Sequence, residues 1–172
     1  MGLESYFIHL LPKGVIPIRV DIGDGFTATD FRGKSAVKAS SIVEAIQMAL
    51  PCRFNQDKLV VDESIEVWIS GEKDLFQKAT LVGCLAWYDE GLKLCYQISC
   101  VINQCVQVQA YQQVMGFVSL DSEEIFYQSI RDTYQKQYQA FIGTFGDIKA
   151  QVLPGRDFHD FYRGIRKPGR KA

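Results

Sequence analysis

A regular row of aromatic and aliphatic side chains near the C-terminal end constrains the fold more than any other feature of the chain. Apolar residues recur every three or four positions, which is the period of one face of an α-helix. Asp121 and Glu124 have the spacing of a capping box, so the pattern predicts a helix over 121–142, about 30 Å long. We expect its aromatic stripe to lie in the core, packed on a β-sheet. The stripe consists of Phe126, Ile130, Tyr134, Tyr138, Phe141 and Phe145.

The middle of the chain predicts part of that sheet. Apolar and polar residues alternate over 92–100, as they do in a half-buried strand. The apolar segment 79–88 is the expected partner strand, and Gly91 is expected in the turn between the two, at positive φ. The alternation resumes over 106–111, which predicts a third antiparallel strand whose glutamines face solvent.

The remaining patterns predict further strands and one short helix. Ser41 and Glu44 form a second capping box, which favours a helix over 42–50 that stops before Pro51. Because the strands follow one another in hairpins, we expect an α+β fold. It would hold an antiparallel sheet of about five or six strands, covered by the helices at about 42–50 and 121–142. The other predicted strands are 5–11, the hairpin 16–31, 59–61 and 65–69.

Residues 28–35 match the loose phosphate-loop pattern A-x-x-x-x-G-K-S. Gly33, Lys34 and Ser35 are therefore candidate cofactor-binding residues, and Asp62, which follows an apolar segment, is a candidate carboxylate for magnesium. A small nucleotide-binding enzyme is the function that this pattern would imply. However, the pattern lies largely within the second strand of the predicted hairpin, and Asp30 would bring a negative charge into the phosphate site.

His159 is the centre of a second group of candidate catalytic residues. Asp157 and Asp160 flank it, and a histidine beside carboxylates can act as a general base. This arrangement would suit a hydrolase or a transferase. The chain has no G-x-S-x-G motif and no histidine pair at metal-ligand spacing that would strengthen the case.

The five cysteines indicate reduced thiols rather than a structural framework. Their number is odd and no C-x-x-C pair occurs, so we expect neither disulfides nor a metal site. In the predicted strand over 92–100, Cys95 would lie on the outer face. We therefore expect Cys95→Ser to be mild and Cys100→Ser to cost more.

Charge is distributed unevenly along the chain. The formal net charge is −1, yet the last ten residues carry five cations and no acid, which leaves −6 for residues 1–162. We expect 1–162 to form one globular domain and 163–172 a basic tail that folds back on it. Contact with nucleic acid or an anionic membrane is expected only through this tail. Its cations are Arg163, Arg166, Lys167, Arg170 and Lys171.

The function expected from the sequence is reached by elimination. The N-terminus has no signal-like segment and no apolar run is long enough to span a bilayer as a helix, which favours a cytoplasmic protein. Catalytic candidates are few, while tyrosine and glutamine are frequent, as in many protein interfaces. We expect a non-catalytic protein-binding module without a cofactor, of a regulatory, inhibitory or immunity type, that covers a partner surface. Two enzymes stay open as alternatives: a small nucleotide-binding enzyme that uses residues 28–35 with Asp62, and a hydrolase or transferase centred on His159.

Overall fold

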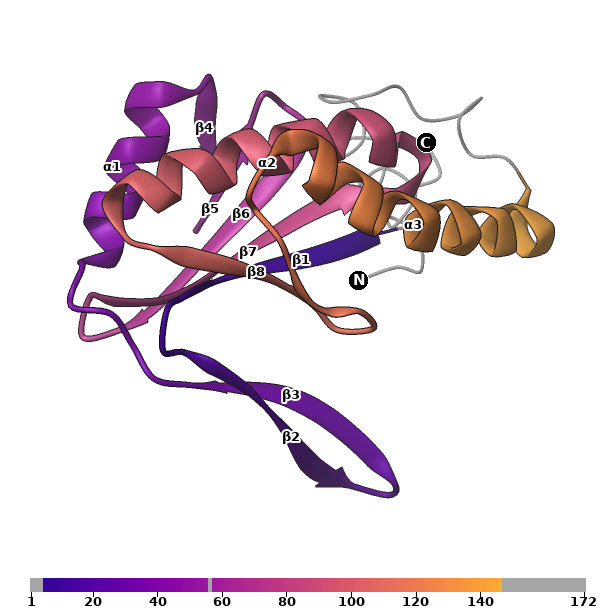
Figure 1. The fold of residues 1–172 in the computed structure, drawn as a ribbon, viewed down its shortest axis with the longest axis horizontal. Helices are drawn as coiled ribbons and strands as arrows, with labels where there is room; N and C mark the ends of the chain where they lie inside the picture. Colours follow the sequence, from indigo (N-terminus) through magenta and orange to yellow (C-terminus); the bar gives the residue numbers. More distant parts are fainter. Residues whose placement is uncertain (1–4, 56, 147–172) are drawn as a thin grey trace, which may run out of the picture.

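The computed structural model describes residues 5–55 and 57–146, and these form an α+β fold. A seven-stranded antiparallel sheet has the order β4-β5-β6-β7-β1-β8-β9, and three helices lie together on one of its faces (Figure 1). A separate hairpin, β2–β3, extends away from the sheet. The strands are β1 (Ser5–Pro12), β2 (Ile16–Gly23), β3 (Phe26–Arg32), β4 (Cys52–Asn55), β5 (Lys58–Val61), β6 (Ile65–Glu72), β7 (Leu75–Cys84), β8 (Val108–Gln112) and β9 (Gly116–Val118); the helices are α1 (Ala39–Ala49), α2 (Tyr88–Cys105) and α3 (Glu123–Phe145).

The predicted α+β class and antiparallel sheet are confirmed, as are the N-terminal strand, the hairpin and the long C-terminal helix. The sheet has more strands than the five or six expected. The N-cap of helix α3 lies one residue later than predicted, because Ser122 and not Asp121 caps the helix. The Ser122 hydroxyl accepts a 3.2 Å hydrogen bond from the Ile125 N–H.

Helix α1 confirms a helix near 42–50, but the predicted Ser41–Glu44 capping box is wrong. The helix begins at Ala39, and the turn between β6 and β7 supplies the partner for its first N–H groups. The Asp74 carboxylate accepts hydrogen bonds from the Ser40 N–H at 3.0 Å and from the Ser40 hydroxyl at 2.8 Å. A carboxylate brought in by tertiary structure therefore does what a local cap would do.

The predicted strand over 92–100 and its turn at Gly91 are wrong, because both belong to helix α2. Strand β7 ends at Cys84, and a single 3₁₀ turn leads into the helix. The buried side chains of α2 recur at helical spacing, so the helix packs one face on the sheet. The cysteine expectation is reversed as well, since Cys95 is buried and Cys100 is exposed. The buried residues are Tyr88, Gly91, Leu92, Cys95, Ile98, Ser99 and Ile102.

Tyr6 of β1 and Tyr134 of α3 are the two largest fully buried side chains, and they meet where the sheet, α2 and α3 come together. Tyr6 is 1% exposed, and its ring stacks on that of Tyr134 with 4.7 Å between centroids. A Cβ atom at Gly83 of β7 or at Gly91 of α2 would collide with the Tyr6 side chain. These two glycines are therefore required for close approach and not for a turn.

We predict that Gly91→Ala destabilises the protein by about 1–3 kcal/mol, because the added methyl group overpacks the core against Tyr6. Gly143 on α3 is the matched control, since a Cβ there meets open space. Gly143→Ala should stabilise the protein by about 0.5–1 kcal/mol through helix propensity. Urea unfolding of both variants measures the two changes. Equal effects of the two substitutions would contradict the packing assigned to Gly91.

Candidate functional site

The structure does not bring the candidate nucleotide-binding residues together. Gly33, Lys34 and Ser35 lie in the connector after β3, and the Lys34 ammonium forms a 3.1 Å ion pair with Glu72 at the end of β6. Asp62 lies in the turn before β6 begins. The two groups are therefore at opposite ends of an eight-residue strand, which spans about 26 Å.

The other sequence candidates give no site within the described part of the chain. Asp157, His159 and Asp160 lie outside the described residues, as does the basic tail 163–172. All five cysteines are free thiols. Within residues 5–55 and 57–146, no cluster of histidine, cysteine and acidic side chains could hold a metal ion, and no helix has the length and apolar character to cross a membrane.

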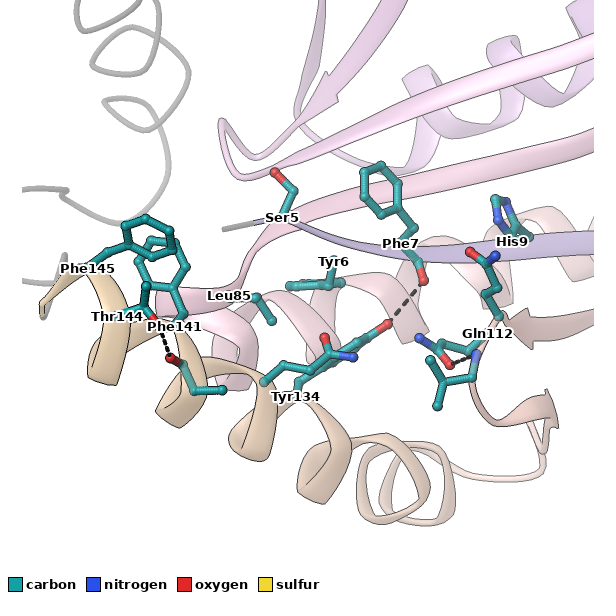
Figure 2. A pocket seen from close by; sticks show the side chains of 14 residues that line it. Ser5, Tyr6, Phe7, His9, Leu85, Gln112, Tyr134, Phe141, Thr144 and Phe145 are labelled. Atoms are coloured by element: carbon teal, nitrogen blue, oxygen red, sulfur yellow. Dashed lines mark hydrogen bonds between the residues drawn. The ribbon is translucent and has the colours of Figure 1, made fainter. Parts of the chain in front are cut away.

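A cavity of about 740 Å³ lies beside the N-terminal half of β1 (Figure 2). Its main walls are β1 itself, the end of β8 with the turn that links β8 to β9, and the C-terminal half of α3; Leu85 of the 3₁₀ turn after β7 completes the lining. We call it the β1 cavity. Its lining residues are Ser5, Tyr6, Phe7, His9, Leu85, Gln112, Gln113, Val114, Tyr134, Gln137, Ala140, Phe141, Thr144 and Phe145.

Two hydrogen-bonded groups fix the walls of the β1 cavity. The Tyr134 hydroxyl donates a 3.1 Å hydrogen bond to the Phe7 carbonyl oxygen, which ties α3 to β1 (Figure 2). The Gln112 carboxamide oxygen accepts from the backbone N–H groups of Val114, at 2.7 Å, and Met115, at 2.9 Å. The Tyr134 bond therefore sets the position of α3 beside β1, and the Gln112 bonds close the β8–β9 turn on itself.

The described residues that line the β1 cavity carry no formal charge at neutral pH. Within 5–55 and 57–146, none of the lining residues is Asp, Glu, Lys or Arg. Burial, and then the nearby Lys78, lower the pKa of His9 from 6.5 to about 4, so this ring is neutral. Burial is also the main reason why the pKa of the Tyr134 hydroxyl is raised well above its usual value. The cavity therefore suits an uncharged ligand that offers apolar groups and a few hydrogen-bonding groups.

The hairpin β2–β3, which we call the arm, is the second candidate site. Its base is anchored, because Phe31 is 6% exposed, lies 4.9 Å from the His9 ring and has the Lys78 ammonium 4.3 Å from its own ring centroid. Beyond Phe31 the arm projects from the body (Figure 1), and its two strands pair only with each other among the described strands.

The two faces of the arm differ in chemistry. The cross-strand register places Val20 opposite Ala28 on one face and Arg19 opposite Thr29 on the other. The outer part of the first face is apolar and open, with Ile22 64% and Phe26 68% exposed. Nearer the base, the register places Asp30 opposite Ile18 and Arg32 opposite Ile16, so charged side chains share that part of the face. We call the outer part the apolar arm face. It consists of Val20, Ile22, Phe26 and Ala28.

Sequence reasoning predicted the arm as a hairpin but missed both sites. The alternation of Ile16, Ile18, Val20 and Ile22 was visible, yet it does not say whether the apolar face is covered. The β1 cavity left no local signal, because β1 is about a hundred or more positions away from the β8–β9 turn and from α3 in the sequence. Tyr134 was expected in the core, and it is both core and cavity wall.

We predict that His9 makes the folded protein less stable in mild acid. Its pKa is about 4 when folded and near 6.5 when unfolded, so only the unfolded chain takes up the proton as the pH falls from 6.5 to 4. The loss reaches about 3 kcal/mol at pH 4 and is absent above pH 7. Unfolding free energies of the wild type and of His9→Gln between pH 7 and 4 test this. The difference between them should shrink or change sign in that window, and parallel curves would contradict the assignment.

Comparisons with known proteins do not assign a function to either candidate site. No protein-family model matches the chain, and no curated protein or solved structure matches it either. The function must therefore be argued from the geometry of the arm and the cavity.

Proposed function

We propose that this chain is a non-catalytic protein-binding module that covers a surface of a partner protein with the apolar arm face. The observation that carries this proposal is a projecting hairpin whose outer part has one apolar face, which is uncovered among the described residues. Contiguous exposed apolar side chains of this kind mark interaction sites in folded proteins.

The energetics of a hairpin support the proposal. An isolated two-stranded hairpin is only marginally stable in water, and it becomes stable when a hydrophobic face packs against something else. Among the described residues, only the base of the arm has such packing, where Phe31 joins Leu11 and Val15 in a small cluster. A partner that covered Val20 and Phe26 would remove apolar surface from water, which is the main favourable term in association.

The shape of the arm fits a role in recognition. The anchored base holds the hairpin in place, while the tip, Gly23-Asp24-Gly25, is turned tightly with all three residues at positive φ. Such a preformed element has less conformational entropy to lose on binding than a flexible loop. A regulatory, inhibitory or immunity-type protein could use it to cover a functional surface of its partner.

We also propose a cytoplasmic location. All five cysteines are free, although the chain offers several thiols near the core, and free thiols are typical of proteins in a reducing compartment.

A photo-crosslinking amino acid placed on each face of the arm tests the proposed function. We predict that the probe at Val20, on the apolar arm face, yields a discrete adduct with another protein in cells that produce the chain. The probe at Thr29, on the opposite face of the same hairpin, is the matched control and should yield none. Equal adducts from both positions, or none from Val20, would sink the proposal. An adduct of two copies of this chain would show self-association instead.

A further inference from the structure

The two neighbours of strand β1 pair with different parts of it. Strand β7 runs beside Ser5–Leu10, whereas β8 pairs with β1 only over His9–Pro12. Beyond Tyr111, which is opposite His9, strand β8 turns away into the β8–β9 turn. Among the described residues, no strand lies beside the β8-side edge of residues 5–8, and the β1 cavity occupies this place.

The backbone of this edge points hydrogen-bonding groups into the β1 cavity. The Phe7 carbonyl faces the cavity, because it accepts the hydrogen bond from Tyr134. Along a strand, the N–H and C=O of one residue point to the same side and those of the next residue to the other. The Lys13 N–H donates a 2.9 Å hydrogen bond to the Gln107 carbonyl oxygen. In β1, the odd-numbered residues are therefore those whose backbone N–H and C=O groups point toward β8. The Phe7 N–H therefore also points into the cavity.

We propose that the β1 cavity binds an extended, uncharged peptide segment of a partner protein, which adds a strand to β1 in line with β8. Strand addition to an exposed sheet edge is a recurring mode of peptide recognition, in which backbone hydrogen bonds supply affinity and flanking pockets supply specificity. The open edge of residues 5–8 is about 13 Å long and accommodates about four residues of a bound segment.

The chemistry of the walls selects this occupant. The described lining residues include no charged side chain, so a charged peptide residue would lose its hydration without gaining a counter-charge from them. Charge complementarity therefore favours a neutral segment. Phe141 and Phe145, whose rings lie 4.9 Å apart, together with Val114 form apolar walls for its side chains. Gln113 and Gln137 offer amide groups to its backbone. The hydrogen bond from the Tyr134 hydroxyl to the Phe7 carbonyl oxygen can stay in place when a peptide binds, since a carbonyl oxygen can accept two hydrogen bonds.

The site is tested on the full chain with a displayed library of linear heptapeptides that lack charged residues. We expect selected peptides to bind the wild type and to lose at least about tenfold in affinity against Ala140→Arg, which fills the cavity from α3. Gln139→Arg is the matched control, because Gln139 is exposed beside Ala140 and does not line the cavity. Absence of selected peptides, or equal affinity for both variants, would overturn the proposal.

The binding mode is tested by N-methylation of each backbone amide of a selected peptide. Strand addition predicts an alternating result, with affinity reduced about tenfold at every second position and little changed between. The Phe7 amide should exchange rapidly with deuterium in the free protein and slowly in the complex. A flat N-methyl scan would overturn strand addition. Protection of the Phe7 amide in the free protein would do so too, and would assign the edge to another part of the chain or to a second copy.

This inference is independent of the arm. The variants at residues 139 and 140 leave the arm unchanged, so peptide binding can succeed where crosslinking from Val20 fails, and the reverse.

Discussion

The close packing of the Tyr6 side chain against two glycines is the constraint on which the rest of the structure depends. Tyr6 lies on β1, Gly83 on the neighbouring strand β7, Gly91 on α2, and Tyr134 on α3, so four elements meet at one aromatic ring. Burial, and then the proximity of the Cys95 thiol, raise the pKa of the Tyr6 hydroxyl, which therefore keeps its proton. Because protein interiors are densely packed, a ring of this size fixes how closely α2 and α3 approach the sheet.

The same constraint places the β1 cavity. Tyr134 stacks on Tyr6 and at the same time donates its hydroxyl to the Phe7 carbonyl, so the core contact sets the distance between α3 and the open edge of β1. The aromatic stripe of α3 then divides into two parts. Its first residues are buried in the core, and its last, Phe141 and Phe145, become the wall of the cavity.

The sequence was sufficient to predict elements whose periodicity has only one interpretation. The long helix and the N-terminal hairpin were of this kind, since neither the spacing of the stripe nor the glycines at the tip of the arm suit another structure. Helix α2 was missed because Leu92, Leu94, Tyr96 and Ile98 alternate in sequence, although Leu92, Cys95, Ser99 and Ile102 also share a helical face. Treating Cys95 and Ser99 as polar surface residues hid that second pattern. Gly91 then suggested a turn, whereas its role is to leave space for Tyr6.

The candidate sites were harder to predict, for different reasons. The β1 cavity joins residues around Phe7, Gln112 and Phe141, whose proximity results from tertiary packing alone. The apolar arm face is evident in the sequence as alternation, but alternation normally indicates a face that packs on the core. Only the arrangement in space distinguishes a projecting hairpin from a strand of the main sheet. The capping of α1 by Asp74 was hidden in the same way, because its partner lies far along the chain.

A double-mutant cycle between Tyr6 and its two glycines tests the packing account most directly. A Cβ at Gly91 collides only with the Tyr6 hydroxyl, and the next atom, Cζ, is 3.3 Å away. A Cβ at Gly83 also collides with the ring itself. Tyr6→Phe should therefore reduce the cost of Gly91→Ala by about 1 kcal/mol or more and leave the cost of Gly83→Ala nearly unchanged. Equal costs of Gly91→Ala in both backgrounds, measured by urea unfolding, would contradict the account.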